Sequence, residues 1–128
     1  MKYLVDTHLL LWAASDPGRL STTARSVIED TDNALYFSVA ALWEVVIKGS
    51  LNRADFVVDP ALLRRGLVNN GYFELPIDGN HVLAVTGLPD IHRDPFDRIQ
   101  IAQARVDGFQ FLTADSAVAA YGDPVRKV

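Results

Sequence analysis

The sequence predicts an α/β fold in which helices cover both faces of a parallel sheet of four to five strands. Short apolar, β-prone runs alternate along the chain with longer runs that begin at helix-capping residues and end at glycine or a turn. This alternation is typical of parallel sheets, because their strands are joined by helices that bury both faces. The chain has 128 residues, of which 49% are apolar, so we expect one domain over residues 1–128.

In the first half of the chain, strand and helix alternate twice. The predicted elements are a strand over residues 3–5, a helix over 7–14, a loop at 16–18, a helix from 21 through 29, a strand over 35–37 and a helix from 38 through 48. Ser21 and Ser38 are candidate N-caps, because a serine oxygen can accept a hydrogen bond from a free backbone N–H of the first turn. Gly49 is the expected end of the helix that begins at Ser38.

The second half repeats the alternation and adds a helix. The predicted elements are a helix from 59 to about 70, a strand over 72–77, a helix from 78 to about 86, a helix from 94 to 107, a strand over 109–113, a short helix over 115–121 and a candidate edge strand over 125–128. Asp59 and Asp94 both precede a proline, and a cap followed by proline at the first helical position predicts a helix start. Gly108 is the expected end of the helix that begins at Asp94.

Four acidic residues lie where strand-like runs give way to helices. Asp6 closes the first strand, Glu44 lies inside the helix after the second, Asp97 lies in the first turn of a later helix, and Asp115 follows a buried strand. The helix from 97 to 107 descends about 15 Å and the following strand returns roughly 20 Å, so Asp97 and Asp115 come back to the same level. In open parallel sheets this level, beyond the carboxyl ends of the strands, is where ligands bind.

Glu44 is the least expected of these acids, because it has six apolar neighbours in residues 41–47. A glutamate in such a setting is rarely buried without a partner. Helical side chains lean toward the N-terminus, so a glutamate can reach back to the level of the other three acids. We therefore expect Glu44 to take part in the same site.

Converging carboxylates repel one another unless a cation joins them. A ligand set made of oxygen atoms favours a hard divalent ion, Mg²⁺ or Mn²⁺. The chain contains no cysteine, which excludes thiolate metal sites and disulfides and suits a cytoplasmic protein. These observations together indicate metal-dependent phosphate chemistry.

The net charge of −4 argues against indiscriminate coating of nucleic acid, although the four acids alone account for it. Asp6 and His8 interrupt the apolar run near the amino end, and no run approaches about 18 apolar residues. We therefore expect no export signal and no membrane span.

Each acid also has a structural interpretation. Asp6 and Asp115 could be turn or capping residues. Glu44 could pair with Lys48 at i, i+4, a contact worth only about 0.2–0.5 kcal/mol. Asp97 lies in a first turn, where the helix dipole favours any carboxylate. The four together are more informative than any one alone.

Four segments resemble a known family. The strings VDTHLLLWA, SVAALWEVVIK, HRDPFDRIQIAQA and FLTAD closely resemble the PIN domain, and specifically the VapC-type toxins of VapBC toxin–antitoxin pairs. The resemblance spans nearly the whole chain, and the DPFDR and TAD segments are its most specific parts. It implies a three-layer α/β/α sandwich, Mg²⁺- or Mn²⁺-dependent endoribonuclease activity on RNA, a cognate antitoxin as partner, and commonly a homodimer.

By motif, the family's acidic set maps onto Asp6, Glu44, Asp97 and Asp115, and none of the four is missing. His8 stands where many PIN domains carry asparagine after DT. The expected reaction is hydrolysis of an RNA phosphodiester by a metal-activated water. Asp6, Asp97 and Asp115 would be the principal metal ligands, with Glu44 either a further ligand or the base.

Other residues have supporting predictions. Hydroxyls next to the strand ends could orient ligands or phosphate, and these are Thr7, Ser38 and Thr113. Candidate RNA-binding residues are Lys48, Arg93, Arg98 and His8, for which surface solvation is the alternative. For His81 and His92 we prefer helix-surface or cap roles, and for Asp94 a cap that also pairs with Arg98. The stripe of Leu9, Leu10, Trp12 and Ala13 is expected to be core or a subunit interface.

Two other classes compete with a nuclease. A catalytically silent binding module could use the acidic pocket to receive a basic peptide, and metal-dependent turnover would distinguish the two. An aspartyl-phosphate enzyme of the haloacid dehalogenase type would show DxD after its first strand, whereas Thr7 and His8 follow Asp6 here. A receiver domain would need an early acidic pair, which the sequence lacks.

Overall fold

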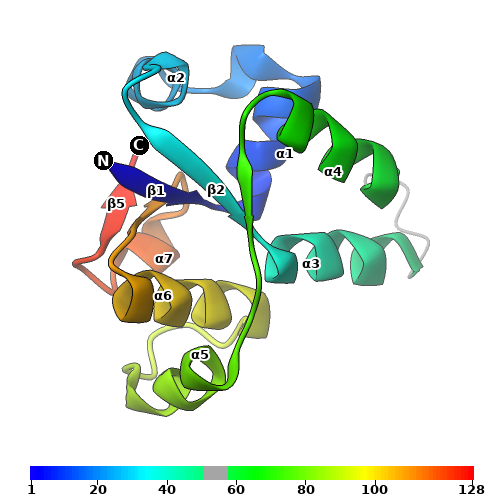
Figure 1. Cartoon of the computed structure of the whole chain (residues 1–128). Helices are drawn as coiled ribbons and strands as arrows, with labels where there is room; N and C mark the ends of the chain where they lie inside the picture. The colour runs from blue at the N-terminus through cyan, green and yellow to red at the C-terminus, as the bar shows by residue number, and fades with distance from the viewer. Residues whose placement is uncertain (51–57) are drawn as a thin grey trace.

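The computed structural model describes residues 1–50 and 58–128, and within them the strands form one parallel sheet (Figure 1). The strand order is β3-β2-β1-β4-β5, and every neighbouring pair is parallel. The strands are β1 (Lys2–Val5), β2 (Ala34–Ser38), β3 (Phe73–Leu75), β4 (Gln110–Thr113) and β5 (Val125–Lys127). The predicted α/β class and the sheet of four to five parallel strands are confirmed.

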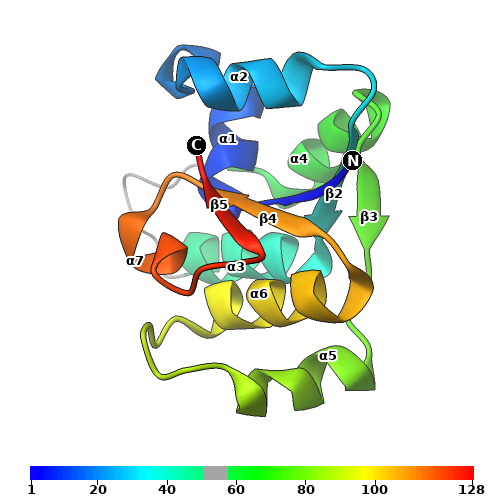
Figure 2. The same cartoon turned by 90° about the vertical axis from the view of Figure 1, so that its left-hand side faces the viewer.

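Helices cover both faces of this sheet. They are α1 (Thr7–Ser15), α2 (Thr22–Glu29), α3 (Val39–Ser50), α4 (Pro60–Asn69), α5 (Gly79–Ala84), α6 (Pro95–Asp107) and α7 (Ser116–Ala119), with 3₁₀ turns η1 (Pro17–Arg19) and η2 (Val85–Gly87). Figures 1 and 2 show α1, α2 and α4 on one face and α5, α6 and α7 on the other. Helix α3 packs against α1, α4 and α6.

The central strand β1 joins the two halves of the core. Its side chains alternate, so Tyr3 and Val5 enter the apolar cluster under α1, α2 and α4, while Leu4 enters the cluster under α6. Leu9 and Leu10 are each 1% exposed in the first cluster, which confirms the core role predicted for them.

The predicted caps explain where several helices begin. Ser21 accepts a hydrogen bond from Ala24 N at 3.0 Å, and Asp59, Asp78 and Asp94 cap α4, α5 and α6 in the same way. At the other end of α6, Gly108 has φ +75°, a left-handed conformation that glycine adopts without steric cost.

Some predicted boundaries were wrong. Strand β3 ends at Leu75, short of residue 77, because Pro76 has no backbone N–H to donate to a ladder. Helix α3 continues to Ser50, past the glycine expected to end it. The helix expected to reach Thr86 tightens into η2 after Ala84, and α7 occupies only Ser116–Ala119 of the predicted 115–121.

The strand order predicts a ligand-binding crevice beside β1. The chain moves from β1 to β2 and β3 on one side, and then crosses to β4 and β5 on the other, so the direction of winding reverses at β1. In open α/β sheets, ligands bind at such a reversal, beyond the carboxyl ends of the strands. We call this edge of the sheet the carboxyl edge. None of the helices in residues 1–50 and 58–128 is long and apolar enough to cross a membrane.

Candidate active site

Asp6 lies at the carboxyl edge directly after β1 and is 3% exposed. Its Oδ1 accepts a hydrogen bond from His8 N at 3.0 Å, so the side chain is the N-cap of α1. Its Oδ2 accepts one from the Thr113 hydroxyl at 2.6 Å, at the end of the neighbouring strand β4. Burial raises the pKa of Asp6, and the negative charge of Glu44 adds to the rise, although these two hydrogen bonds oppose it.

Glu44 comes from α3 and is 2% exposed, as its apolar neighbours predicted. Lys48, one turn later, donates a hydrogen bond to Oε2. Among the described residues, the buried Oε1 has no hydrogen-bond partner. A buried carboxylate oxygen without a partner is costly, and it marks a position where a bound cation or a water would be stabilised.

Asp97 lies in the first turn of α6, behind the cap that Asp94 provides. Its Oδ2 lies 3.0 Å from His92 Nε2. Burial, together with the charges of Asp6, Asp94 and Glu44, raises the pKa of Asp97 to about 7 against the opposing effect of His92. The Asp6, Glu44 and Asp97 carboxylates therefore act on one another electrostatically, and we call these three residues the acidic site.

Asp115 is placed differently from the acidic site. It is exposed, and its Oδ1 caps the short helix α7 by accepting from Ala117 N at 2.8 Å. Its backbone N donates to the Thr113 hydroxyl at 3.0 Å, and that hydroxyl in turn donates to Asp6. The structure thus links Asp115 to Asp6 at the carboxyl edge through Thr113, but the Asp115 carboxylate contributes to neither raised pKa.

A tight cluster of metal-type ligands overlaps the acidic site. Among the described residues, the group whose ligand atoms all lie within 4.8 Å of one another consists of His92, Asp94 and Asp97. The four acids predicted from the sequence do not form a group of this tightness. His92 was expected to have a surface or cap role, and the only available signal for this contact was its position five residues before Asp97.

The residues present fit a hard divalent cation. The donors of the acidic site are carboxylate oxygens, their charges help to raise the pKa of Asp97, and Glu44 Oε1 has no partner in residues 1–50 and 58–128. A cation bound there would offset the mutual repulsion of the carboxylates and would be coordinated by Glu44 Oε1. This fit agrees with the Mg²⁺ or Mn²⁺ predicted from the sequence.

The three supporting hydroxyls differ in their surroundings. Thr113 holds Asp6 and Asp115, as described above. Ser38 Oγ accepts from Ala40 N at 2.9 Å and donates to Gln103 Oε1, so it caps α3 and ties it to α6. The Thr7 hydroxyl is buried and has no partner among the described residues.

The basic residues also divide into two kinds. His8 is exposed, with Nδ1 3.8 Å from Asp6 Oδ1, and Arg93 is exposed beside α6. Lys48 is engaged with Glu44. Arg98 donates to the carbonyls of Pro89, His92 and Val85 and to the Tyr121 hydroxyl, which favours a structural role over contact with RNA.

Lys127 is a basic residue at the carboxyl edge that the sequence reasoning missed. It ends β5 in register with Thr113, and its Nζ donates to Ser116 Oγ at 2.7 Å, next to Asp115 in the sequence. The candidate edge strand over 125–128 was its sequence signal, but the pairing of that strand was needed to place the side chain.

His81 was expected on a helix surface or in a cap, and only the cap is correct. It is 1% exposed and forms a capping box with Asp78, whose backbone N donates to Nδ1 at 3.0 Å. Its Nε2 lies 2.8 Å from Asp107 Oδ2, so it joins the start of α5 to the end of α6.

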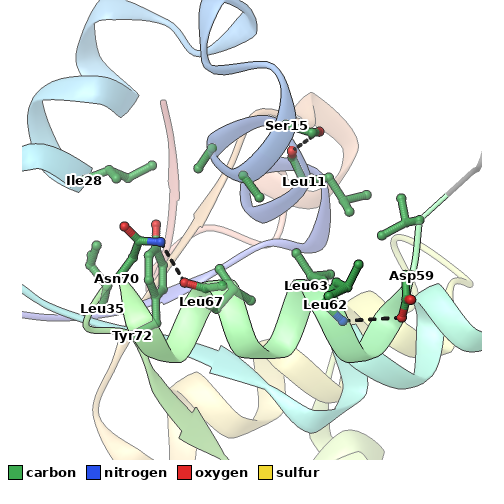
Figure 3. Close-up of a pocket in the computed structure, with 14 residues that line it drawn as sticks. Leu11, Ser15, Ile28, Leu35, Asp59, Leu62, Leu63, Leu67, Asn70 and Tyr72 are labelled. Carbon is green, nitrogen blue, oxygen red and sulfur yellow. Dashed lines mark hydrogen bonds between the residues drawn. The ribbon is translucent and has the colours of Figure 1, made fainter.

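A separate apolar pocket lies between α1, α2 and α4, away from the acidic site (Figure 3). Its volume is about 740 Å³ and its walls carry leucines, among them Leu11, Leu62 and Leu67. The Tyr72 hydroxyl, which has no partner among the described residues, also lines it. Burial raises the pKa of Tyr72 to about 12.

Comparison with known proteins identifies the family. The PIN domain model matches residues 3–124, so the chain belongs to the PIN domain family. A comparison with curated proteins found no match.

Solved structures share the fold over nearly the whole chain. VapBC2 from Rickettsia felis, bound to a DNA fragment from its promoter, has a TM-score of 0.69 at 11% identity and covers 99% of this chain and 98% of its own. VapBC-1 from nontypeable Haemophilus influenzae has a TM-score of 0.65 at 16% identity and covers 100% and 97%. Mycobacterium tuberculosis VapC20, described as a sarcin-ricin loop cleaving toxin, has a TM-score of 0.63 at 19% identity and covers 94% and 95%.

Proposed function

We propose that this chain is a metal-dependent endoribonuclease and the toxin of a toxin–antitoxin pair. The observation that carries the proposal is the acidic site, in which Glu44 Oε1 lacks a partner among the described residues, and burial with the neighbouring carboxylates raises the pKa of Asp97 to about 7. Membership of the PIN domain family supports a nuclease as the class of enzyme.

Asp6, Glu44 and Asp97 would hold a Mg²⁺ or Mn²⁺ ion, and Asp115 would act as a further ligand from the carboxyl edge of the sheet. When bound, the ion would lower the pKa of a water molecule and screen the charge on the scissile phosphate. Thr113 keeps the Asp6 carboxylate in one orientation by donating to Oδ2. Because Lys48 holds Glu44 Oε2, Oε1 is the atom left to bind the ion or to take a proton from the attacking water.

Exposed basic residues beside the acidic site would bind the RNA backbone. His8 and Arg93 have the exposure needed to reach phosphates from outside, and Lys127 adds a charge at the end of β5. RNA as the substrate class is supported by the toxin VapC20, which shares this fold and is described as cleaving the sarcin-ricin loop.

An antitoxin is the proposed partner, because similar structures are toxin–antitoxin complexes. The apolar pocket between α1, α2 and α4 offers such a protein a surface to cover, since leucines are poor in hydrogen-bonding groups and favour apolar side chains. We also propose that this chain forms a homodimer.

The test is cleavage of single-stranded RNA with Mg²⁺, Mn²⁺ or EDTA by the wild type and Asp6→Asn. The wild type should cleave only with a divalent ion, and Asp6→Asn should be slower by about 10²-fold or more, because the ligand charge is lost at nearly constant shape. Asp32→Asn, the same change at an exposed turn, is the control and should keep full activity. Full activity in Asp6→Asn would contradict the assignment.

The alternative of a silent binding module makes a different prediction in the same experiment. Such a module would show no turnover with any ion, while still binding a basic peptide in the crevice. Cleavage that depends on both the ion and Asp6 would exclude it.

A further inference from the structure

The loop that delivers His92 to the acidic site has no regular secondary structure of its own. It runs over residues 88–94, between η2 and α6, and its Ile91 is 46% exposed. A loop with so little burial needs specific hydrogen bonds if it is to hold one conformation. The structure supplies them through two side chains from other segments, Arg98 in α6 and Tyr121 after α7.

The Tyr121 hydroxyl makes every hydrogen bond that a phenol can make. It donates to the His92 carbonyl at 3.0 Å, and it accepts from His92 N at 3.0 Å and from Arg98 Nη1 at 3.0 Å. Arg98 in turn donates to the loop carbonyl of Pro89 at 3.0 Å and to that of Val85 at 3.3 Å. Both polar backbone groups of His92 are therefore fixed by one side chain that lies 29 residues away.

Fixing the His92 backbone also fixes where its ring can point. Once the backbone is held, only the staggered side-chain rotamers remain available. In the observed one, Nε2 lies 3.0 Å from Asp97 Oδ2, at the edge of the acidic site. Among the described residues, Tyr121 makes hydrogen bonds to His92 and Arg98 and none to the acidic site itself, so we expect its effect on the site to pass through His92.

We infer that Tyr121 is a positioning residue for the acidic site: its hydroxyl, with Arg98, holds His92 so that the ring orients the Asp97 carboxylate for binding a divalent cation. The inference rests on the proposed function, because it assigns a support to the same metal site. Groups that orient metal ligands in this way typically contribute 10–100-fold to metal affinity.

Tyr121→Phe removes the three hydrogen bonds and keeps the ring, which is 7% exposed in the core cluster with Leu88 and Val118. Tyr3→Phe is a matched control, because Tyr3 is 5% exposed and its hydroxyl also accepts from an arginine, Arg126 at 3.2 Å, away from the acidic site. The measurement is Mn²⁺ binding by electron paramagnetic resonance of free Mn²⁺, without RNA.

We expect Tyr121→Phe to weaken Mn²⁺ binding about tenfold relative to both the wild type and Tyr3→Phe. Saturating Mn²⁺ should restore most of kcat, with KM for RNA unchanged. Because the effect passes through His92, Tyr121→Phe should add nothing further in a His92→Ala background. A structural effect alone would add in both backgrounds.

Mn²⁺ affinity in Tyr121→Phe equal to that of Tyr3→Phe would overturn the inference and leave the proposed function standing. So would an equal loss with and without His92. A wild type that binds no Mn²⁺ and cleaves no RNA would overturn the proposed function, and the inference with it.

Discussion

At the scale of single residues, the acidic site holds buried carboxylates close together, which disfavours their negatively charged forms in the folded protein. Asp97 is ordinarily a group with pKa 3.8, and burial beside other acids raises the pKa to about 7. The folded state therefore binds the proton more tightly than the unfolded state does. The contribution of protonated Asp97 to the stability of the folded state is complete below about pH 4, and it is lost as the pH rises through 7.

This loss of stability with rising pH predicts that Asp97→Asn stabilises the metal-free protein at high pH. In EDTA, the free energy of unfolding should exceed that of the wild type by about 2–4 kcal/mol at pH 8, by less at pH 5, and the gap should close toward pH 4. Urea denaturation at the three pH values measures it. Asp32→Asn, at an exposed turn, should change the free energy by less than about 0.5 kcal/mol. A wild type as stable as Asp97→Asn at pH 8 would contradict the assignment of the raised pKa.

The residue scale also shows where sequence reasoning reached its limit. The burial of Glu44 followed from its apolar neighbours, and the position of Asp6 followed from the end of the first strand. The contact of His92 with Tyr121 did not, because it depends on side-chain direction and on a long-range contact. No local pattern encodes a hydrogen bond between residues 29 apart.

At the scale of elements, the cap of α6 both starts a helix and serves the acidic site. Asp94 Oδ1 accepts from Phe96 N at 2.8 Å and from Asp97 N at 3.3 Å. It also belongs to the tight cluster with His92 and Asp97. Asp59 caps α4 with the same geometry, at 2.9 Å from Ala61 N and 3.3 Å from Leu62 N, but it is not a member of that cluster.

The two caps therefore give a matched pair of variants. Asp94→Ala and Asp59→Ala should each cost about 0.5–2 kcal/mol of stability in urea denaturation, since each removes an N-cap carboxylate before a proline. Only Asp94→Ala should also weaken Mn²⁺ binding, measured by calorimetry, because only it removes a negative charge beside Asp97. Equal Mn²⁺ affinity in the two variants would mean that Asp94 serves the helix alone.

Elements were predicted best where a single residue type decides a boundary. Aspartate before proline, and glycine in a left-handed conformation, set the ends of α6 locally, so both ends were predicted. Both ends of β3 were missed for local reasons. Pro76 ends the strand, and Tyr72 is held outside it because its N–H donates to Leu67 O at 3.0 Å and closes the end of α4. No residue pattern in the sequence predicted that the helix would tighten into the 3₁₀ turn η2 after Ala84.

At the scale of the whole molecule, the apolar pocket is lined by none of the residues of the acidic site. Leu62 lines the pocket from α4 and is 58% exposed, so it can be changed without opening the core. A partner that covers this surface would bury it. Catalysis and partner binding should then be separable by mutation.

Leu62→Arg should reduce binding of the antitoxin by about tenfold or more, because it places a charge in an apolar interface, while RNA cleavage stays unchanged. Binding is measured by calorimetry with the proposed antitoxin. Leu83→Arg is the control, since Leu83 is 70% exposed on α5, on the opposite face of the sheet. If Leu62→Arg binds as well as Leu83→Arg does, the antitoxin binds elsewhere.

The order of strands in the sheet has a consequence for a chain emerging from the ribosome. Asp6 is translated before its neighbour β4, which brings Thr113. Asp97 also follows Asp6 by 91 residues in the chain. We expect every nascent chain that lacks β4 to be inert, so the proposed nuclease would become active only after residue 113 has been synthesised.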